Sequence, residues 1–226
     1  MRTVIIGLAG CALAALPLTA QTYSDPNTGV EFPTQLVPPG GAGEHVLTGT
    51  GVRTRTFLKV KVYAFGLYVE PAGARTALAS YAGKPAADLQ RDDAFYAKLL
   101  ERSFPMTLRL VMTRDVGGET MAEAFDGALR PRVQDAGSKG MTGGEAALDQ
   151  FRSFFGEEVA KGTELVFSCT PAGHFTTAIA GASKPDIESP ALCWALFDVY
   201  LGAKPISSDG KKTVVGNIPQ ILAGSM

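Results

Sequence analysis

Residues 51–70, GVRTRTFLKVKVYAFGLYVE, combine a group of cations with a run of strand-forming residues. The interpretation of the fold depends on how this stretch is arranged. Val, Tyr, Phe and Thr favour the pleated surface of a β-strand, so the stretch predicts strand structure. No acidic residue occurs in it before Glu70, and its cations are Arg53, Arg55, Lys59 and Lys61. One interpretation is a solvated strand face with Tyr63 in the core. The other is an anion site, in which the planar fork of Arg53 pairs with a carboxylate and the Tyr63 hydroxyl donates a second hydrogen bond.

The anion-site interpretation makes a demand on the path of the chain. Arg53 and Tyr63 have the same parity, but one straight strand between them would hold them about 33 Å apart. Both side chains can reach one carboxylate only if the chain reverses between Thr56 and Lys59. The hypothesis therefore predicts a hairpin turn in a segment that contains no Gly, Pro or Asn.

The rest of the chain alternates between strand and helix patterns. Residues 45–70 predict strands, and residues 163–181 predict a hairpin. Residues 106–113 predict a strand with one dry face, formed by Met106, Leu108, Leu110 and Met112, and a more polar face, formed by Thr107, Arg109, Val111 and Thr113. Apolar residues at helical spacing predict helices over 72–102, 119–135, 145–162, 189–202 and 207–222. Strands joined by hairpins and followed by helices favour an α+β domain, with an antiparallel sheet and helices over one face.

The first twenty residues, MRTVIIGLAGCALAALPLTA, have the layout of a secretory signal. Arg2 precedes an apolar run, and Ala20 offers a cleavage site. A membrane anchor is the alternative, but the run is short for a bilayer span. We expect a signal over 1–20, an extended lead-in over 21–39 and one domain over 40–226. This predicts a secretory or organelle route (plastid, ER or extracellular), with no integral membrane domain after the signal is removed.

Composition and charge exclude several classes of function. With 21 basic and 22 acidic residues the chain carries no net positive field for nucleic acid. There is no CxxC motif, and His45 and His174 are the only imidazoles, so we expect no metal site and no cofactor. We expect both histidines at the surface or in turns. Cys169 and Cys193 remain after signal removal; they pair in an oxidising compartment or stay separate buried thiols, and we prefer separate thiols.

Three segments together resemble the chalcone isomerase superfamily: GTGVRTRTFLKVKVYAFGLYVE at 49–70, the strand FPMTLRLV and the late helix SPALCWALFDVYLGAKPIS. They occur in the family order over about residues 40–218. The resemblance implies an open-faced β-sandwich, in which a layer of helices covers a large antiparallel sheet. It also implies one of two functions. Chalcone isomerases close a flavonoid ring by adding a phenolate to an enone, whereas the non-catalytic branch holds a fatty acid in the same cleft.

The resemblance also assigns residues. The Arg and Tyr that grip the carboxylate in the fatty-acid-binding branch correspond to Arg53 and Tyr63. The Tyr and Asn of the enzyme fall at Thr120 and Gly127, its strand Thr falls at Tyr63, and its late Ser or Thr falls near Val199. A second register, through GGAGEH at 40–45, would place His45 at the arginine of the enzyme.

The polar set that stabilises a developing enolate is therefore missing, and we expect a non-catalytic protein that binds a fatty acid or similar apolar carboxylate. Phe65 and Met112 are candidate tail contacts, and Thr120 is a further ligand-binding candidate. A chalcone isomerase and an accessory protein without a ligand are the alternatives.

Overall fold

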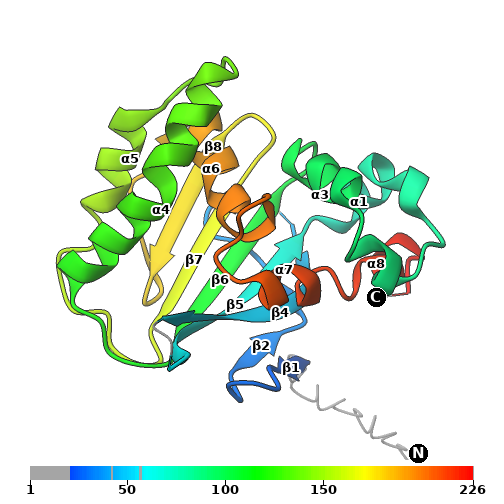
Figure 1. Cartoon of the computed structure of the whole chain (residues 1–226), viewed down its shortest axis with the longest axis horizontal. Coiled ribbons are helices and arrows are strands. Elements are labelled where there is room, and N and C mark those ends of the chain that lie inside the picture. The colour runs from blue at the N-terminus through cyan, green and yellow to red at the C-terminus, as the bar shows by residue number, and fades with distance from the viewer. Residues whose placement is uncertain (1–20, 42, 56–57, 226) are drawn as a thin grey trace, which may run out of the picture.

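The computed structural model describes residues 21–41, 43–55 and 58–225. Its centre is an antiparallel sheet of eight strands in the order β10-β8-β7-β6-β5-β4-β3, with β9 paired to β8 (Figure 1). These strands are β3 (Gln35–Leu36), β4 (His45–Arg55), β5 (Val60–Val69), β6 (Met106–Met112), β7 (Glu164–Cys169), β8 (His174–Ile179), β9 (Ala182–Ser183) and β10 (Ile187–Glu188). A separate two-stranded sheet is formed by β1 (Thr22–Ser24) and β2 (Glu31–Pro33). The predicted signal segment, residues 1–20, lies outside the described residues.

The helices pack on one face of this sheet (Figure 1). They are α1 (Pro71–Ala77), the 3-10 helix η1 (Ala79–Tyr81), α2 (Ala86–Leu89), α3 (Asp93–Leu100), α4 (Gly118–Ser138), α5 (Glu145–Arg152), α6 (Pro190–Leu201), α7 (Ser208–Thr213) and α8 (Ile218–Leu222). The main core lies between them and the sheet, where Phe65 and Leu67 of β5 share a cluster with Phe125 of α4 and Leu196 of α6. The predicted α+β class and open-faced β-sandwich are confirmed.

Close approach of α7 to the sheet depends on one glycine. Gly49 of β4 has a φ of +154°, and a Cβ added there would lie 2.1 Å from the Thr213 carbonyl oxygen. Only glycine leaves room for that backbone contact. The C-terminal segment therefore seats directly on β4, beside the end of the strand that carries Arg53.

The second face of β6 is buried, contrary to the prediction of one dry and one more polar face. All seven residues of β6 are buried, because the N-terminal segment covers the outer face of the sheet. Phe32 of β2 packs there with Leu47, Tyr68 and Val111. Arg109 is 8% exposed and lies 5.1 Å from the centre of the Phe32 ring, where Glu164 neutralises it.

Several predicted helices are shorter than their sequence patterns suggested. The helix predicted over 145–162 ends at Arg152, and Val159 beyond it pairs with Val116 through backbone hydrogen bonds. The 72–102 region divides into α1, η1, α2 and α3, and Asp92 caps α3. The predicted terminal helix is two short helices, and between them the backbone N–H of Asn217 donates to the Thr48 carbonyl. Backbone hydrogen bonds to distant segments thus occur beyond the end of α5 and between α7 and α8, where the apolar patterns had predicted continuous helix.

Two further expectations are corrected by the packing. Cys169 and Cys193 form a disulfide that joins β7 to α6, so they are not separate thiols. His45 is not a surface or turn residue: it is 4% exposed, and its Nδ1 lies 2.9 Å from the Thr107 hydroxyl. His174 does lie at a turn, beside Glu188 and Asp186.

Candidate ligand-binding site

The chain reverses between β4 and β5, as the anion-site hypothesis required. These two strands form an antiparallel hairpin in which Arg53 and Tyr63 are direct cross-strand partners. The register shifts between Arg53 and Thr54, and Lys59 takes a φ of 51° in the turn. A bulge and a left-handed residue therefore provide the reversal that no Gly, Pro or Asn announced. Leu58 and Lys59 are the described residues of the turn.

A cavity of about 920 Å³ opens between this hairpin, α4, α6 and the segment that follows α6. Its apolar lining comes from Val60, Val62, Val116, Met121, Ala124, Phe125, Ala128, Leu129, Leu196, Val199, Pro205 and Ile206. On α4, Gly127 adds no side chain, and a Cβ built there would meet no atom within 4 Å. The cavity thus pairs an apolar wall with free space along one helix.

The polar end of the cavity is formed by Arg53, Tyr63 and Tyr200. The Arg53 guanidinium donates through Nη1 to the Ile206 carbonyl at 2.8 Å, and no other hydrogen bond of its side chain joins it to the described residues. The hydroxyls of Tyr63 and Tyr200 lie 3.0 Å apart, and the two residues are 5% and 2% exposed. Phe65 supports both rings edge-on, with centroid distances of 6.4 Å to Tyr63 and 4.8 Å to Tyr200.

Burial keeps both hydroxyls protonated. It raises the pKa of Tyr63, and it raises the pKa of Tyr200 well above the usual value, while the Arg53 charge acts in the opposite direction on both. Neutral phenols beside a fixed cation are hydrogen-bond donors to an oxyanion. Within the pair one hydroxyl donates to the other, so one O–H remains for a third group. The arrangement suits a carboxylate.

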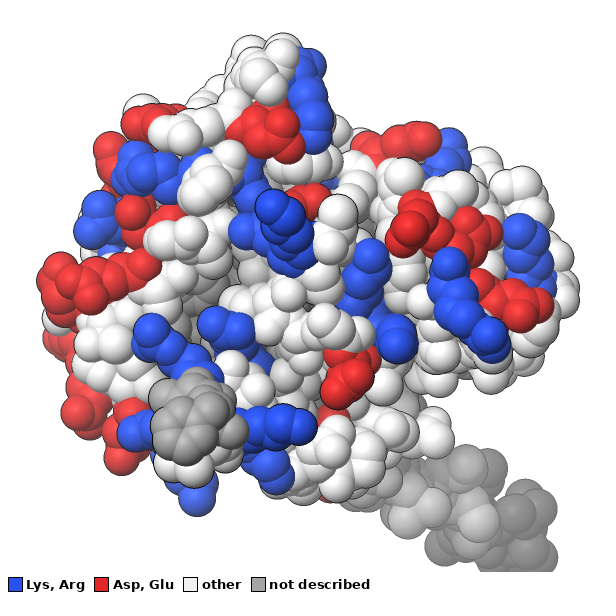
Figure 2. Space-filling model, viewed as in Figure 1, with Lys and Arg blue, Asp and Glu red and all other residues white. Residues whose placement is uncertain are grey.

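Other cations around the cavity differ in how they are neutralised. Arg132 is held by Asp198 at 2.8 Å and by the carbonyls of Ala128 and Lys204. Arg55 and Arg114 also line the cavity and have no ion pair with any described residue. Figure 2 shows basic side chains on several sides of the hollow on this face. The field at the mouth is therefore positive, although Asp115 and Glu123 also line the cavity.

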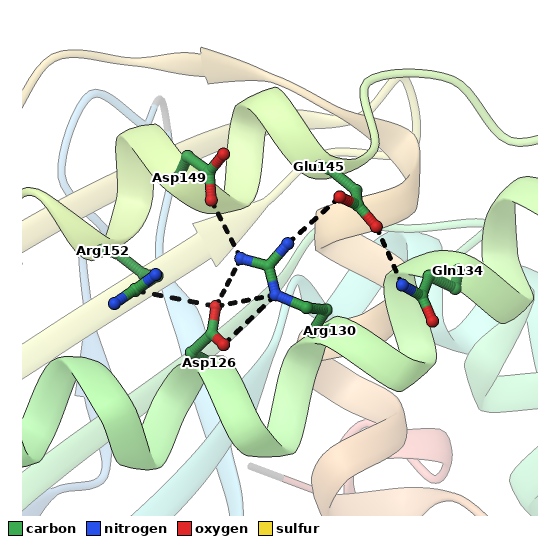
Figure 3. Close-up of polar contacts among 6 residues, drawn as sticks. All are labelled: Asp126, Arg130, Gln134, Glu145, Asp149 and Arg152. Carbon is green, nitrogen blue, oxygen red and sulfur yellow. Dashed lines mark hydrogen bonds and ion pairs between the residues drawn. The ribbon is translucent and has the colours of Figure 1, made fainter.

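A second polar cluster fixes α4 from its other side (Figure 3). Arg130 contacts Asp126 on α4 at 2.6 Å, and it contacts Asp149 at 2.9 Å and Glu145 at 3.2 Å on α5. The hydrogen bond from Arg130 lowers the pKa of Asp126, so this carboxylate stays charged. The network joins α4 to α5 and thereby positions the wall of the cavity. Among the described residues no group of His, Cys, Asp and Glu is arranged to hold a metal.

The structure brings together three of the predicted site residues. Arg53, Tyr63 and Thr120 line the cavity, and Gly127 and Val199 line it too. Phe65 and Met112, the predicted tail contacts, are not among the residues that line the cavity. They are 0% and 1% exposed. Tyr200 was not predicted as a site residue, although its segment ALFDVYLG was singled out. Only the fold brings α6 against β5 and so reveals its role.

The fold and the cavity define an α+β protein with an open cavity, which has an apolar wall and a polar end formed by Arg53, Tyr63 and Tyr200. The family model described as chalcone isomerase like matches residues 43–215, and the chain belongs to this family.

Its relatives include both functional branches. The chain is 33% identical over 221 residues to fatty-acid-binding protein 2 of Arabidopsis thaliana, covering 94% of this chain and 54% of that protein. It is also 33% identical over 208 residues to a chalcone–flavanone isomerase of Hordeum vulgare, covering 87% of this chain and 89% of that enzyme. The crystal structure of the Arabidopsis thaliana fatty-acid binding protein AtFAP1 matches with a TM-score of 0.75 at 23% identity, over 90% of this chain and 100% of that chain. This chain thus spans about half of one relative and most of the other.

Proposed function

We propose that this protein binds a fatty acid or similar apolar carboxylate and does not catalyse isomerisation. One observation carries the proposal: the β4–β5 hairpin places Arg53 beside Tyr63, at one end of a cavity with an apolar wall. The relatives named as fatty-acid-binding proteins support it.

The polar end supplies complementary donors for a carboxylate head. The Arg53 guanidinium has five N–H donors, and only Nη1 forms a hydrogen bond to a described residue. The rest of the planar fork is therefore available to a carboxylate. The tyrosine pair contributes one further O–H. A charge-assisted hydrogen bond contributes about 1.5–3 kcal/mol, more than a neutral one, so Arg53 is the dominant group of the head site.

The apolar wall accounts for the tail. Each buried methylene stabilises the complex by about 0.8 kcal/mol, or roughly fourfold in affinity, until the cavity is full. Ligand pockets generally measure about 300–1,000 Å³, so this cavity has room for a small-molecule ligand. That volume disfavours an accessory protein without a ligand.

The test begins with native mass spectrometry of the purified protein and extraction of any bound lipid. Saturated fatty acids of increasing length are then titrated into the wild-type protein and Arg53→Ala. We expect affinity to rise with chain length in the wild type and to fall about 10- to 100-fold in Arg53→Ala, since the variant loses the charge-assisted pair.

Arg53→Lys is the first control, because it keeps the charge but loses the fork, and we expect an intermediate loss. Arg75→Ala, an exposed cation on α1, is the second control and should bind as the wild type does. An Arg53→Ala protein that is folded and binds with unchanged affinity would falsify the head site.

Chalcone isomerisation is the second candidate, favoured by the 33% identity to the barley enzyme. The four positions that correspond to the polar residues of the enzyme all line the cavity, but here they are Tyr63, Thr120, Gly127 and Val199. Gly127 and Val199 have no polar side-chain atom to stabilise a developing enolate. Loss of chalcone absorbance faster than the spontaneous reaction would establish the enzyme and displace the proposal of a purely binding protein.

We further propose that the protein enters a secretory or organelle route. The layout of residues 1–20 is the main support, and the Cys169–Cys193 disulfide suits an oxidising compartment. Among the described residues no helix is long and apolar enough to cross a bilayer. The mass of the protein recovered from cells checks the proposal, because a cleaved signal leaves Gln21 as the first residue.

A further inference from the structure

We propose that the described residues on either side of the β4–β5 turn dock on an anionic lipid surface, with the cavity mouth facing the bilayer. The docking tip consists of Arg55, Leu58, Lys59, Lys61 and Arg114. The inference rests on the proposed function for its purpose, the exchange of an apolar acid with a membrane. Its physical basis is separate, because Leu58, Lys59 and Lys61 do not line the cavity.

Leu58 provides the apolar part of the tip. It is 70% exposed, more than the other large apolar side chains that the described residues expose, Val37 at 62% and Tyr23 at 43%. One exposed leucine is ordinary on a protein surface. Its position in the chain distinguishes it, because it lies in the turn next to Lys59, whose φ is 51°, and Arg55 and Lys61 are close to it in sequence on the two strands.

The cations of the tip are left without partner carboxylates. Arg55, Lys59, Lys61 and Arg114 form no ion pair with any described residue, and the Lys61 ammonium donates only to the Asn27 carbonyl. Arg109, Arg130 and Arg132, by contrast, are each held by a carboxylate. Asp115 lies beside Arg114 and is the adjacent acid. Figure 2 shows this concentration of basic side chains around the lower end of the molecule, on a chain with a net charge of −1.

The tip also lies where the cavity opens. Arg55 and Arg114 belong to both the tip and the cavity lining, and Val60 continues the lining into β5. Arg55 and Val60 are paired across the hairpin, so the strands approach lipid with their shared backbone hydrogen bonds made. A surface that receives the tip therefore meets the mouth of the cavity.

The chemistry favours a lipid surface over an acidic protein. A hairpin tip is small, whereas a stable protein interface buries about 800 Å² on each partner. Leu58 gains free energy only where an apolar phase receives it, and an anionic bilayer offers such a phase directly below its charged headgroups. Basic side chains near that surface each strengthen binding about fivefold, and salt screens their effect.

The test is co-sedimentation of the purified protein with phosphatidylcholine vesicles that do or do not contain phosphatidylglycerol. The variant is Leu58→Ser with Lys59→Asn, in which asparagine tolerates the left-handed φ at position 59. We expect the wild type to sediment with the anionic vesicles, less so as salt rises, and the double variant to bind at least about tenfold more weakly. The matched control is Val37→Ser with Arg75→Asn, which removes an exposed apolar side chain and an exposed cation elsewhere and should bind as the wild type does.

A second measurement separates this inference from the proposed function. Without vesicles, the double variant should bind soluble fatty acid as the wild type does, since neither residue lines the cavity. Vesicle binding by an Arg53→Ala protein that no longer binds fatty acid would support the docking surface independently. Equal sedimentation with neutral and anionic vesicles, or an unchanged double variant, overturns the proposal. Retention on polyglutamate without any vesicle binding also overturns it, in favour of an acidic protein partner.

Discussion

At the scale of single residues, the space in the cavity depends on a glycine, which has no side chain to fill it. Gly127 lies inside α4, where glycine costs about 1 kcal/mol relative to alanine. It lines the cavity and its missing side chain leaves open space. The position therefore sets how much of the cavity is available to a ligand tail.

Gly127→Leu should shorten the longest acid that the cavity accepts. We expect affinity for long fatty acids to fall while affinity for short ones changes little, because the leucine occupies the space of the distal tail. The free energy of unfolding should rise by roughly 0.5–1 kcal/mol, since a helix former replaces glycine. Titration across chain lengths and chemical denaturation measure the two effects.

Gly137→Leu is the matched control for this substitution. Gly137 lies in the same helix, a Cβ there also meets no atom within 4 Å, and the residue does not line the cavity. It should gain stability without any change in chain-length preference. The same affinity profile in both variants would show that Gly127 does not limit the ligand.

At the scale of elements, a buried polar chain connects distant strands of the sheet. His45 on β4 contacts the Thr107 hydroxyl on β6, which donates to Ser168 on β7 at 2.9 Å. Burial lowers the pKa of His45 to about 4, while the Glu70 charge acts in the opposite direction. The folded protein therefore holds this imidazole neutral.

Acidification should destabilise the protein through His45. An unfolded histidine titrates near pH 6.5, so as the pH falls from about 6.5 towards about 4 the unfolded chain gains a proton that the folded chain does not. We expect this to remove roughly 2 kcal/mol from the free energy of unfolding by pH 5. Denaturant titrations at pH 7 and pH 5 should show a smaller loss for His45→Asn than for the wild type.

His174 supplies a control of opposite sign. The hydrogen bond to Glu188 is the main reason that the pKa of His174 is raised, so its charged form stabilises the fold at low pH, and this contribution is lost as the pH rises through that pKa. His174→Asn should therefore lose more stability than the wild type on acidification. Equal losses for the wild type and His45→Asn would refute a buried neutral His45.

At the scale of the whole molecule, one covalent bond connects the sheet to the helix layer. The Cys169–Cys193 disulfide joins β7 to α6, with a sequence separation of 24 residues. Helix α6 carries Leu196, Val199 and Tyr200 into the cavity. The bond therefore constrains the unfolded chain and also holds the helix that completes the polar end of the site.

Cys193→Ala should lower the free energy of unfolding by roughly 3.5 kcal/mol, which is the loop-closure contribution of a ring of this size. Alanine suits the site sterically, because Cys193 is 0% exposed among apolar side chains. Chemical denaturation of the variant beside oxidised and reduced wild type provides the measurement. Matching stability of oxidised wild type, reduced wild type and the variant would mean that the bond contributes nothing to folding.

Much of the fold followed from local patterns in the chain. The alternation in β6, the spacing of Met121, Phe125 and Leu129 in α4 and the late α6 helix each encode an element in nearby residues. Element ends were predicted less well, because the backbone partners that end α5 and divide α7 from α8 come from distant segments. The second face of the sheet was mistaken for a more polar one because the covering residue, Phe32, lies far away in sequence.

The sequence by itself determined the α+β class and the family resemblance, and it identified Arg53 and Tyr63 as candidate residues of one anion site. The tertiary structure decided that the two residues meet, that Tyr200 joins them and that Phe65 and Met112 are not among the residues that line the cavity. It also decided that Cys169 bonds to Cys193 and that His45 is buried. The physical reason is range: periodicity records which side of one element is apolar, whereas a site depends on where turns and packing bring separate elements together.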